Sequence, residues 1–169
     1  TAYRLQLLTQ IARSQGLQRK FDDAHVTLDQ VADRLNDSPP VVRLRYVLER
    51  GRVYNSSGKP DEARPLFLQA WETGRSAGEI GYAVDAAHML GIIEPPDEAL
   101  RWNDLALKSA ENSDDPRARR WLGTLYNNIG WTYHDRGEFE QALDLFEKAL
   151  TVRSGQPDEE QIRIARWCV

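Results

Sequence analysis

The clearest hydrophobic pattern in the chain lies between residues 121 and 153. Apolar or small residues recur every three or four positions over 121–133, and again over 139–150. This spacing places them on one face of a helix, so each stretch predicts an amphipathic helix. Gly137 lies between the two stretches, where glycine can take the left-handed conformation that ends a helix. Two helices joined by so short a turn pack antiparallel, and the pattern therefore predicts a helical hairpin.

Small residues indicate how the two predicted helices pack. Gly130 lies midway along the first helix, and Ala142 lies near the start of the second. Where two helices cross, missing side-chain volume lets the backbones approach closely. We expect large side chains to fill the space on either side of this crossing: Tyr126, Tyr133, Phe139 and Phe146.

This segment resembles a tetratricopeptide repeat. The pattern of that family spans about 34 residues, with an aromatic residue, Leu-Gly and Tyr in the first helix and Ala, Phe and Ala in the second. The matching positions here are Tyr126, Ile129, Gly130, Tyr133, Ala142, Phe146 and Ala149, with Gly137 at the turn. Ser154 departs from the pattern, since the family often has proline there, although Pro157 lies just beyond.

Weaker copies of the same pattern recur three times upstream. The matching residues are Leu8, Ile11, Ala12, Phe21, Ala24, Leu28 and Val31 in the first copy, Val47, Gly51, Tyr54, Gly58, Ala63, Phe67 and Ala70 in the second, and Ala83, Ala86, Ala87, Leu90, Ala99 and Ala106 in the third. Arg50 occupies a position that is usually apolar, and Pro65 falls inside a predicted helix, where it predicts a late start or a kink. Pro95 and Pro96 suit the start of the next helix.

The resemblance implies an all-α fold, a right-handed α-α superhelix (solenoid) of about four helical hairpins plus one extra C-terminal helix. The expected repeats cover roughly 5–38, 44–77, 80–113 and 123–156, followed by a partial helix over 158–169. The turn-proximal alanines (Ala24, Ala63, Ala99 and Ala142) are all further apart than the family's repeat of about 34 residues. In this respect the chain resembles long-repeat arrays such as kinesin light chains.

Charge and composition narrow the function classes. The net charge is −4, and basic and acidic residues are mixed, so no basic face suited to nucleic acid is predicted. The most apolar stretch, 82–93, is interrupted by Asp85 and His88, so no membrane span is expected, and a cytoplasmic location fits best. Cys168 is the single cysteine, and His25, His88 and His134 fall in three different repeats. We therefore expect no disulfide within the chain, no metal site, no cofactor and no catalytic centre.

A partner is expected to bind where the first helices of successive repeats line a concave groove, which in this family commonly holds an extended peptide or a partner's helix. Helical phase selects these candidates: Gln10, Arg13, Arg45, Glu49, Arg52, Asp85, His88, Asn127, Asn128, Trp131 and Asp135. Trp131 is either an exposed anchor or a packing residue. Some relatives grip a C-terminal carboxylate with Lys and Asn at such positions. Glu49 and Asp85 would repel a carboxylate, so that type of clamp is not expected.

Three functional hypotheses follow. The first is a non-catalytic scaffold that binds a protein or peptide in the concave groove. The second is a ligand- or peptide-sensing regulatory domain of a larger signalling protein. The third is a self-associating module, because the apolar Trp167 and Val169 at the C-terminal helix could join two copies of the chain.

Overall fold

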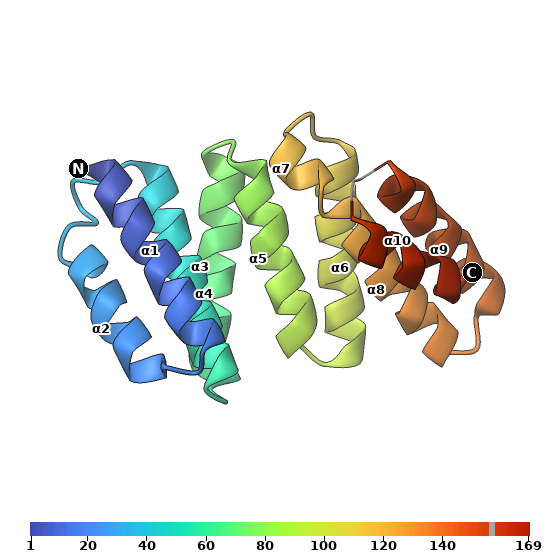
Figure 1. The fold of residues 1–169 in the computed structure, drawn as a ribbon, viewed down its shortest axis with the longest axis horizontal. Helices are drawn as coiled ribbons and strands as arrows, with labels where there is room; N and C mark the ends of the chain where they lie inside the picture. The colour runs from blue at the N-terminus through green and yellow to red at the C-terminus, as the bar shows by residue number, and fades with distance from the viewer. Residues whose placement is uncertain (156–157) are drawn as a thin grey trace.

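The computed structural model describes residues 1–155 and 158–169, and within these ranges every regular element is helical (Figure 1). The elements are α1 (Ala2–Leu17), α2 (Phe21–Ala32), α3 (Pro40–Ser56), α4 (Pro60–Ser76), α5 (Ile80–Ile93), α6 (Pro96–Glu111), α7 (Pro116–Arg119), α8 (Leu122–Asp135), α9 (Phe139–Ser154) and α10 (Glu159–Cys168). The predicted all-α class is confirmed. The expected end of the fourth repeat at residue 156, and Pro157 beside it, lie outside the described residues.

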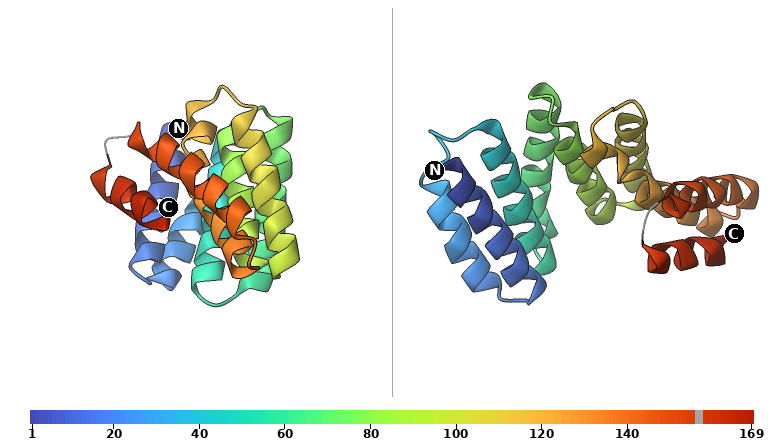
Figure 2. Two further views of the ribbon diagram at one scale, coloured as in Figure 1. Left: turned by 90° about the vertical axis from the view of Figure 1, so that its right-hand side faces the viewer. Right: turned by 45° about the horizontal axis from the view of Figure 1, so that its top comes forward.

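Eight of the helices form four antiparallel hairpins, α1–α2, α3–α4, α5–α6 and α8–α9. Between neighbouring hairpins, the closest packing joins α1 with α3, α4 with α5, and α6 with α8, and α10 packs against α9. Figures 1 and 2 show the hairpins side by side in one row, with the two termini at opposite ends. The predicted solenoid is therefore confirmed.

A missing side chain on the first helix makes room for an aromatic ring of the second helix in two hairpins. A Cβ atom at Gly51 would lie 2.6 Å from Cε1 of Phe67, and one at Gly130 would lie 2.7 Å from Cε1 of Phe146. Both separations are far below van der Waals contact between carbon atoms. The predicted close approach at Gly130 is confirmed, and Gly51 with Phe67 repeats it.

The other two hairpins pack differently at the crossing of their helices. Ala12 and Leu28 hold the equivalent positions in α1–α2 and are fully buried. In α5–α6 the close approach is at Gly91, where a Cβ atom would lie 2.7 Å from Oδ1 of the buried Asn103. In α1–α2, a residue larger than glycine on the first helix is thus accompanied by one smaller than phenylalanine on the second, as close packing requires.

Three expectations from the sequence are wrong in detail. Phe139 does not fill the hairpin interior: it is the first residue of α9, lies before the helices cross, and is 63% exposed. In α1, Ile11 is exposed, and the buried stripe is Leu5, Thr9 and Ala12. Pro65 does not delay α4, which begins at Pro60; it lies early in the helix and on the exposed side, where water can reach the carbonyl left without a donor.

The turns within three of the hairpins, α1–α2, α3–α4 and α8–α9, repeat one conformation. Gly58 and Gly137 have φ angles of 82° and 78°, in the left-handed region that ends a helix, as predicted for Gly137. Arg19 takes the same conformation after α1, with φ 61°. The first hairpin therefore keeps the turn without the glycine that favours it.

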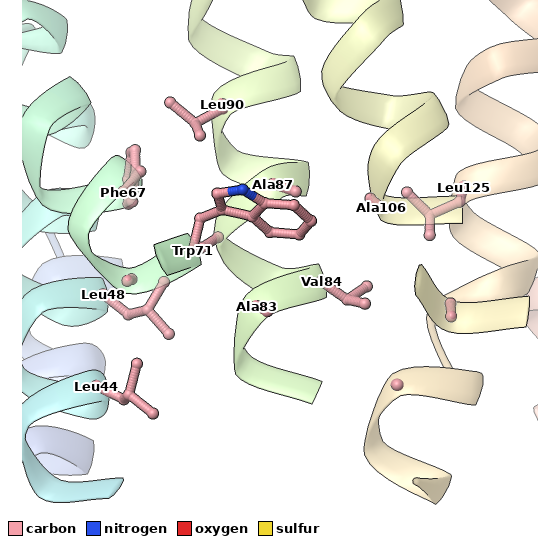
Figure 3. Packing of buried hydrophobic residues seen from close by; sticks show 14 of the residues in the cluster. Leu44, Leu48, Phe67, Trp71, Ala83, Val84, Ala87, Leu90, Ala106 and Leu125 are labelled. Atoms are coloured by element: carbon pink, nitrogen blue, oxygen red, sulfur yellow. The ribbon is translucent and has the colours of Figure 1, made fainter. Parts of the chain in front are cut away.

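The largest hydrophobic core runs through the middle of the row, from α3 to α8. Figure 3 shows Trp71 of α4 directed towards Ala87 of α5, with Phe67 and Leu90 beside it. Trp71 also meets Trp102 of α6 edge to face, with ring centroids 5.7 Å apart. The core thus passes from one hairpin to the next, and no hairpin buries its apolar face alone. Among the described residues, no helix combines the length and the apolar character that crossing a membrane requires.

Short α7 is a feature that the sequence analysis missed. It follows α6 and lies against α5, where a Cβ at Gly81 would be 2.6 Å from Cβ of Arg117. Asp115 caps α7 by accepting hydrogen bonds from the N–H groups of Arg117 (2.9 Å) and Gly81 (3.2 Å). Arg117 in turn donates to Glu79 at 3.0 Å. This insertion explains the long interval between Ala99 and Ala142.

Arg50, at the usually apolar position, is 8% exposed and joins α3 to α2. Its guanidinium donates to Oδ1 of Asp29 at 2.5 Å and lies 2.8 Å from Nδ1 of His25. Burial lowers the pKa of His25, and the adjacent Arg50 lowers it further. A neutral imidazole can accept a hydrogen bond from Arg50, whereas an imidazolium would repel it.

We predict that the chain loses stability as the pH falls from 7.5 to 5.5. The folded-state pKa of His25 is below the ordinary value of 6.5, so the unfolded chain binds more protons in this range and acid favours unfolding. The thermal midpoint should fall less over this range in His25→Asn, whose amide oxygen can still accept from Arg50. His134→Gln, at the exposed end of α8, is the matched control. An equal fall in wild type and His25→Asn would contradict the prediction.

Candidate peptide-binding surface

We call the surface presented by the first helices α1, α3, α5 and α8 the inner face; along it, α1 contacts α3 and α3 contacts α5. Four of the predicted partner-binding residues form a continuous charged row across three of these helices. Arg52 of α3 donates to Glu49 at 2.7 Å and to Asp85 of α5, and Arg13 of α1 lies 3.8 Å from Glu49. The side chains of Glu49, Arg52 and Asp85 are only 11–16% exposed, whereas that of Arg13 is 45% exposed.

Burial and mutual attraction both act on this row. Burial raises the pKa of Glu49, although Arg52 and Arg13 oppose the effect. Burial also acts to lower the pKa of Arg52, but Asp85 and Glu49 outweigh it, and the pKa of Arg52 is raised. The row therefore links three hairpins, and each of its buried charges is compensated by an opposite charge of the same row.

A pocket of about 190 Å³ opens beside the charged row, between α3, α5 and the segment that carries α7. It is lined by Arg45, Leu48, Glu49, Arg52, Gly81, Tyr82, Asp85, Arg117, Arg120 and Trp121. Arg45, Glu49, Arg52 and Asp85 were predicted from helical phase, and the structure brings them together here. Tyr82, Arg117, Arg120 and Trp121 were not predicted. The Asp-Pro at 115–116, typical of a capped helix start, was the available signal for α7.

His88 lies at the edge of this region and contacts Trp121, with ring centroids 4.9 Å apart. Burial lowers the pKa of His88, which favours the neutral imidazole. His88 is thus packed against the residue that precedes α8, and it links the third hairpin to the fourth.

The remaining predicted residues lie on the fourth hairpin, next to α10. Trp131 packs against Phe146 (5.4 Å between ring centroids) and against Trp167 of α10 (6.2 Å). Oδ1 of Asn127 lies 3.6 Å from Sγ of Cys168. Trp131 therefore packs within its own hairpin and against α10.

For two of the predicted residues the structure shows hydrogen bonds within α8. The carbonyl of Asn128 accepts from the hydroxyl of Thr132 at 3.1 Å, and the Asn128 side chain is half-buried. Asp135 is exposed at the end of α8, 3.3 Å from Nδ1 of His134. Within the described ranges, no three His, Cys, Asp or Glu residues are grouped so that they could hold a metal ion. Partner binding by any of these side chains stays a prediction.

We predict that Arg52→Met lowers the free energy of unfolding by about 3–5 kcal/mol, because it leaves the buried Asp85 without its ion pair and Glu49 with only the more distant Arg13. The triple variant Arg52→Met, Glu49→Leu, Asp85→Leu should recover most of this loss, since it removes all three buried charges. Arg13→Met is the matched control and should cost less than about 1 kcal/mol, as expected for a long, exposed ion pair. Urea unfolding followed by circular dichroism measures all three. A triple variant as unstable as Arg52→Met would contradict the account.

Several solved structures share this fold, among them the three that follow. The match to the crystal structure of BtubC (BKLC) from P. vanneervenii covers 99% of this chain and 79% of the BtubC chain, with a TM-score of 0.75 and 16% sequence identity. The match to a putative kinesin light chain from Podosopora anserina, with nearly identical TPR-like repeats, covers 99% of this chain and 88% of that chain, with a TM-score of 0.69 and 17% sequence identity. The match to the apo form of the quorum sensor NprR from B. thuringiensis covers 96% of this chain and 57% of the NprR chain, with a TM-score of 0.53 and 14% sequence identity.

The sequence comparisons agree with the structural ones. No curated protein sequence matches the chain. A family model described as tetratricopeptide repeat matches residues 85–154, which include α6, α7, α8 and α9. The resemblance inferred from Gly130, Phe146 and their neighbours is confirmed, and so is the likeness to kinesin-light-chain-type arrays. Residues 85–154 thus match the tetratricopeptide repeat model, and the chain as a whole has the superhelical fold of the solved structures that resemble it.

Proposed function

We propose that this chain is a non-catalytic scaffold that binds an extended peptide segment of another protein along its inner face. The tetratricopeptide repeats at 85–154 support a protein-interaction role. The observation that carries the proposal is the joining of Glu49, Arg52 and Asp85 into one fixed polar row beside a pocket. A polar surface that is already ordered loses little side-chain entropy when a partner binds.

The inner face offers two kinds of contact to such a peptide. At the second and third hairpins, guanidinium and carboxylate groups can pair with polar side chains or with the peptide backbone. At the fourth hairpin, Trp131 is half-buried and still partly accessible beside Trp167. An aromatic ring of this kind can anchor an apolar residue of the same peptide.

The proposal predicts where a bound peptide protects the chain. Random-sequence peptides displayed on phage would be selected on the immobilised chain, and the binders then added during hydrogen exchange. Amide protection should increase along α1, α3, α5 and α8 and stay unchanged along α2, α4, α6 and α9. Trp131→Ala should weaken the binding of these peptides by about tenfold or more, as for an aromatic hot spot.

Phe139→Ala is the matched control, because it removes an exposed aromatic ring from a second helix. It should leave the affinity unchanged. Protection confined to the second helices, or equal losses in Trp131→Ala and Phe139→Ala, would contradict the proposal.

A further inference from the structure

The charges that line the pocket beside the inner-face row are not all compensated within the chain. Arg52 is paired with Glu49 and Asp85, and Arg117 is paired with Glu79 and Asp115. The two other arginines of the lining are Arg45 and Arg120. Neither forms an ion pair with any carboxylate of the described residues.

Arg45 is held in a defined orientation. Its Nε donates to Oγ1 of Thr9 at 3.1 Å, and the hydroxyl of Thr9, which is fully buried, donates to the carbonyl of Gln6 at 2.7 Å. One edge of the guanidinium is thereby fixed, and its two terminal amino groups are left to donate elsewhere. This pre-orientation lowers the entropy lost when Arg45 binds an anion.

The α7 insertion brings the second arginine to the pocket. Asp115 caps α7 against Gly81, and Arg117 lies over the ring of Tyr82, with 5.3 Å from Cζ to the ring centroid. Arg120 follows α7 directly, and Trp121 comes next in the lining. The pocket lining therefore combines an arginine of α3 and an arginine of the segment after α7 with the aromatic rings of Tyr82 and Trp121.

The two carboxylates of the lining do not cancel this charge. The sequence predicted that Glu49 and Asp85 would repel a carboxylate ligand. In the structure both are bonded to Arg52, and Arg13 lies near Glu49. The charge left for a ligand is that of Arg45 and Arg120, so the pocket attracts an anion.

From this arrangement we infer that the pocket is a binding site for one carboxylate group, presented by an Asp or Glu side chain of the bound peptide. The inference rests on the proposed peptide-binding function and names the chemistry of one subsite. A volume of about 190 Å³ suits a single acidic side chain. Two guanidinium groups can donate several hydrogen bonds to one carboxylate, and the stem of the acidic residue would pack on Trp121.

The test uses a minimal probe, so that it does not depend on a known partner. N-acetyl-glutamate α-amide, in which the side chain carries the only charge, is titrated into the isotope-labelled chain. We expect saturable NMR shifts of the Trp121 indole N–H and of the Arg45 Nε–H, with a dissociation constant in the millimolar range. Arg45→Gln and Arg120→Gln should each weaken binding by about tenfold, as expected for the loss of a charged hydrogen bond.

Arg119→Gln is the matched control, because Arg119 belongs to α7 and is exposed but does not line the pocket. It should bind the probe as wild type does. The absence of saturable shifts, or equal binding of N-acetyl-glutamine α-amide, would overturn the inference. N-acetyl-alanine binding more tightly would assign the site to a peptide C-terminus, and inorganic phosphate binding more tightly would assign it to a phosphate group; either result overturns the inferred ligand.

The outcome separates the inference from the proposed function. If phage-selected peptides protect the inner face but the blocked glutamate does not bind, only the carboxylate site is wrong. If the blocked glutamate binds but no peptide protects the inner face, the site stands and the peptide-binding function is wrong.

Discussion

The close approach of the two helices in each hairpin is the constraint on which the rest of the structure depends. Where Phe67 and Phe146 lie on the second helix, the first helix has a glycine, Gly51 or Gly130, with no room for a Cβ atom. The hairpin that begins with α1 has Ala12 opposite Leu28 instead. In these pairs the smaller residue of the first helix faces the larger residue of the second, which lets the two backbones approach closely. This close crossing sets the positions of the first helices.

The polar inner face follows from that placement. When first helices stand side by side, the charged residues on their shared surface are brought within reach of each other. Arg52 of α3 bonds to Asp85 of α5, and Arg13 of α1 approaches Glu49 of α3. Most of the charged side chains that were predicted to bind a partner are therefore already paired with each other. A partner can pair only with the other groups of this surface, which include Arg120 and Trp121, placed at the pocket by α7.

Local pattern was sufficient to predict the hairpins, because glycine, alanine and aromatic spacing is a property of each helix pair. The close contact at Gly130 and the left-handed turn at Gly137 could be predicted for the same reason. Helical phase also selected Arg45, Glu49 and Asp85 for the surface where they are found. Phase could not show that Arg52 would bond to Asp85, since that contact depends on the angle between two hairpins.

The insertion was missed for a different physical reason. A helix as short as α7 has no hydrophobic periodicity, and its position depends on the contact between Gly81 and Arg117, which are far apart in sequence. The buried Arg50 also required tertiary partners, His25 and Asp29, that a repeat pattern does not reveal. In both cases the structure depends on a contact between residues that are far apart in the sequence, and a local pattern cannot show that such residues meet.

The packing of a glycine against an aromatic ring is tested most directly by a double-mutant cycle on Gly51 and Phe67, in which the free energy of unfolding is measured. Gly51→Ala should cost about 1–3 kcal/mol through overpacking, although alanine is the better helix former. Gly16→Ala, whose Cβ would meet only Val53 at 3.4 Å, should be neutral or stabilising. In the Gly51→Ala background, Phe67→Leu should cost less than it does in wild type, by about 0.5–3 kcal/mol of coupling. Strict additivity of the two substitutions would contradict the account.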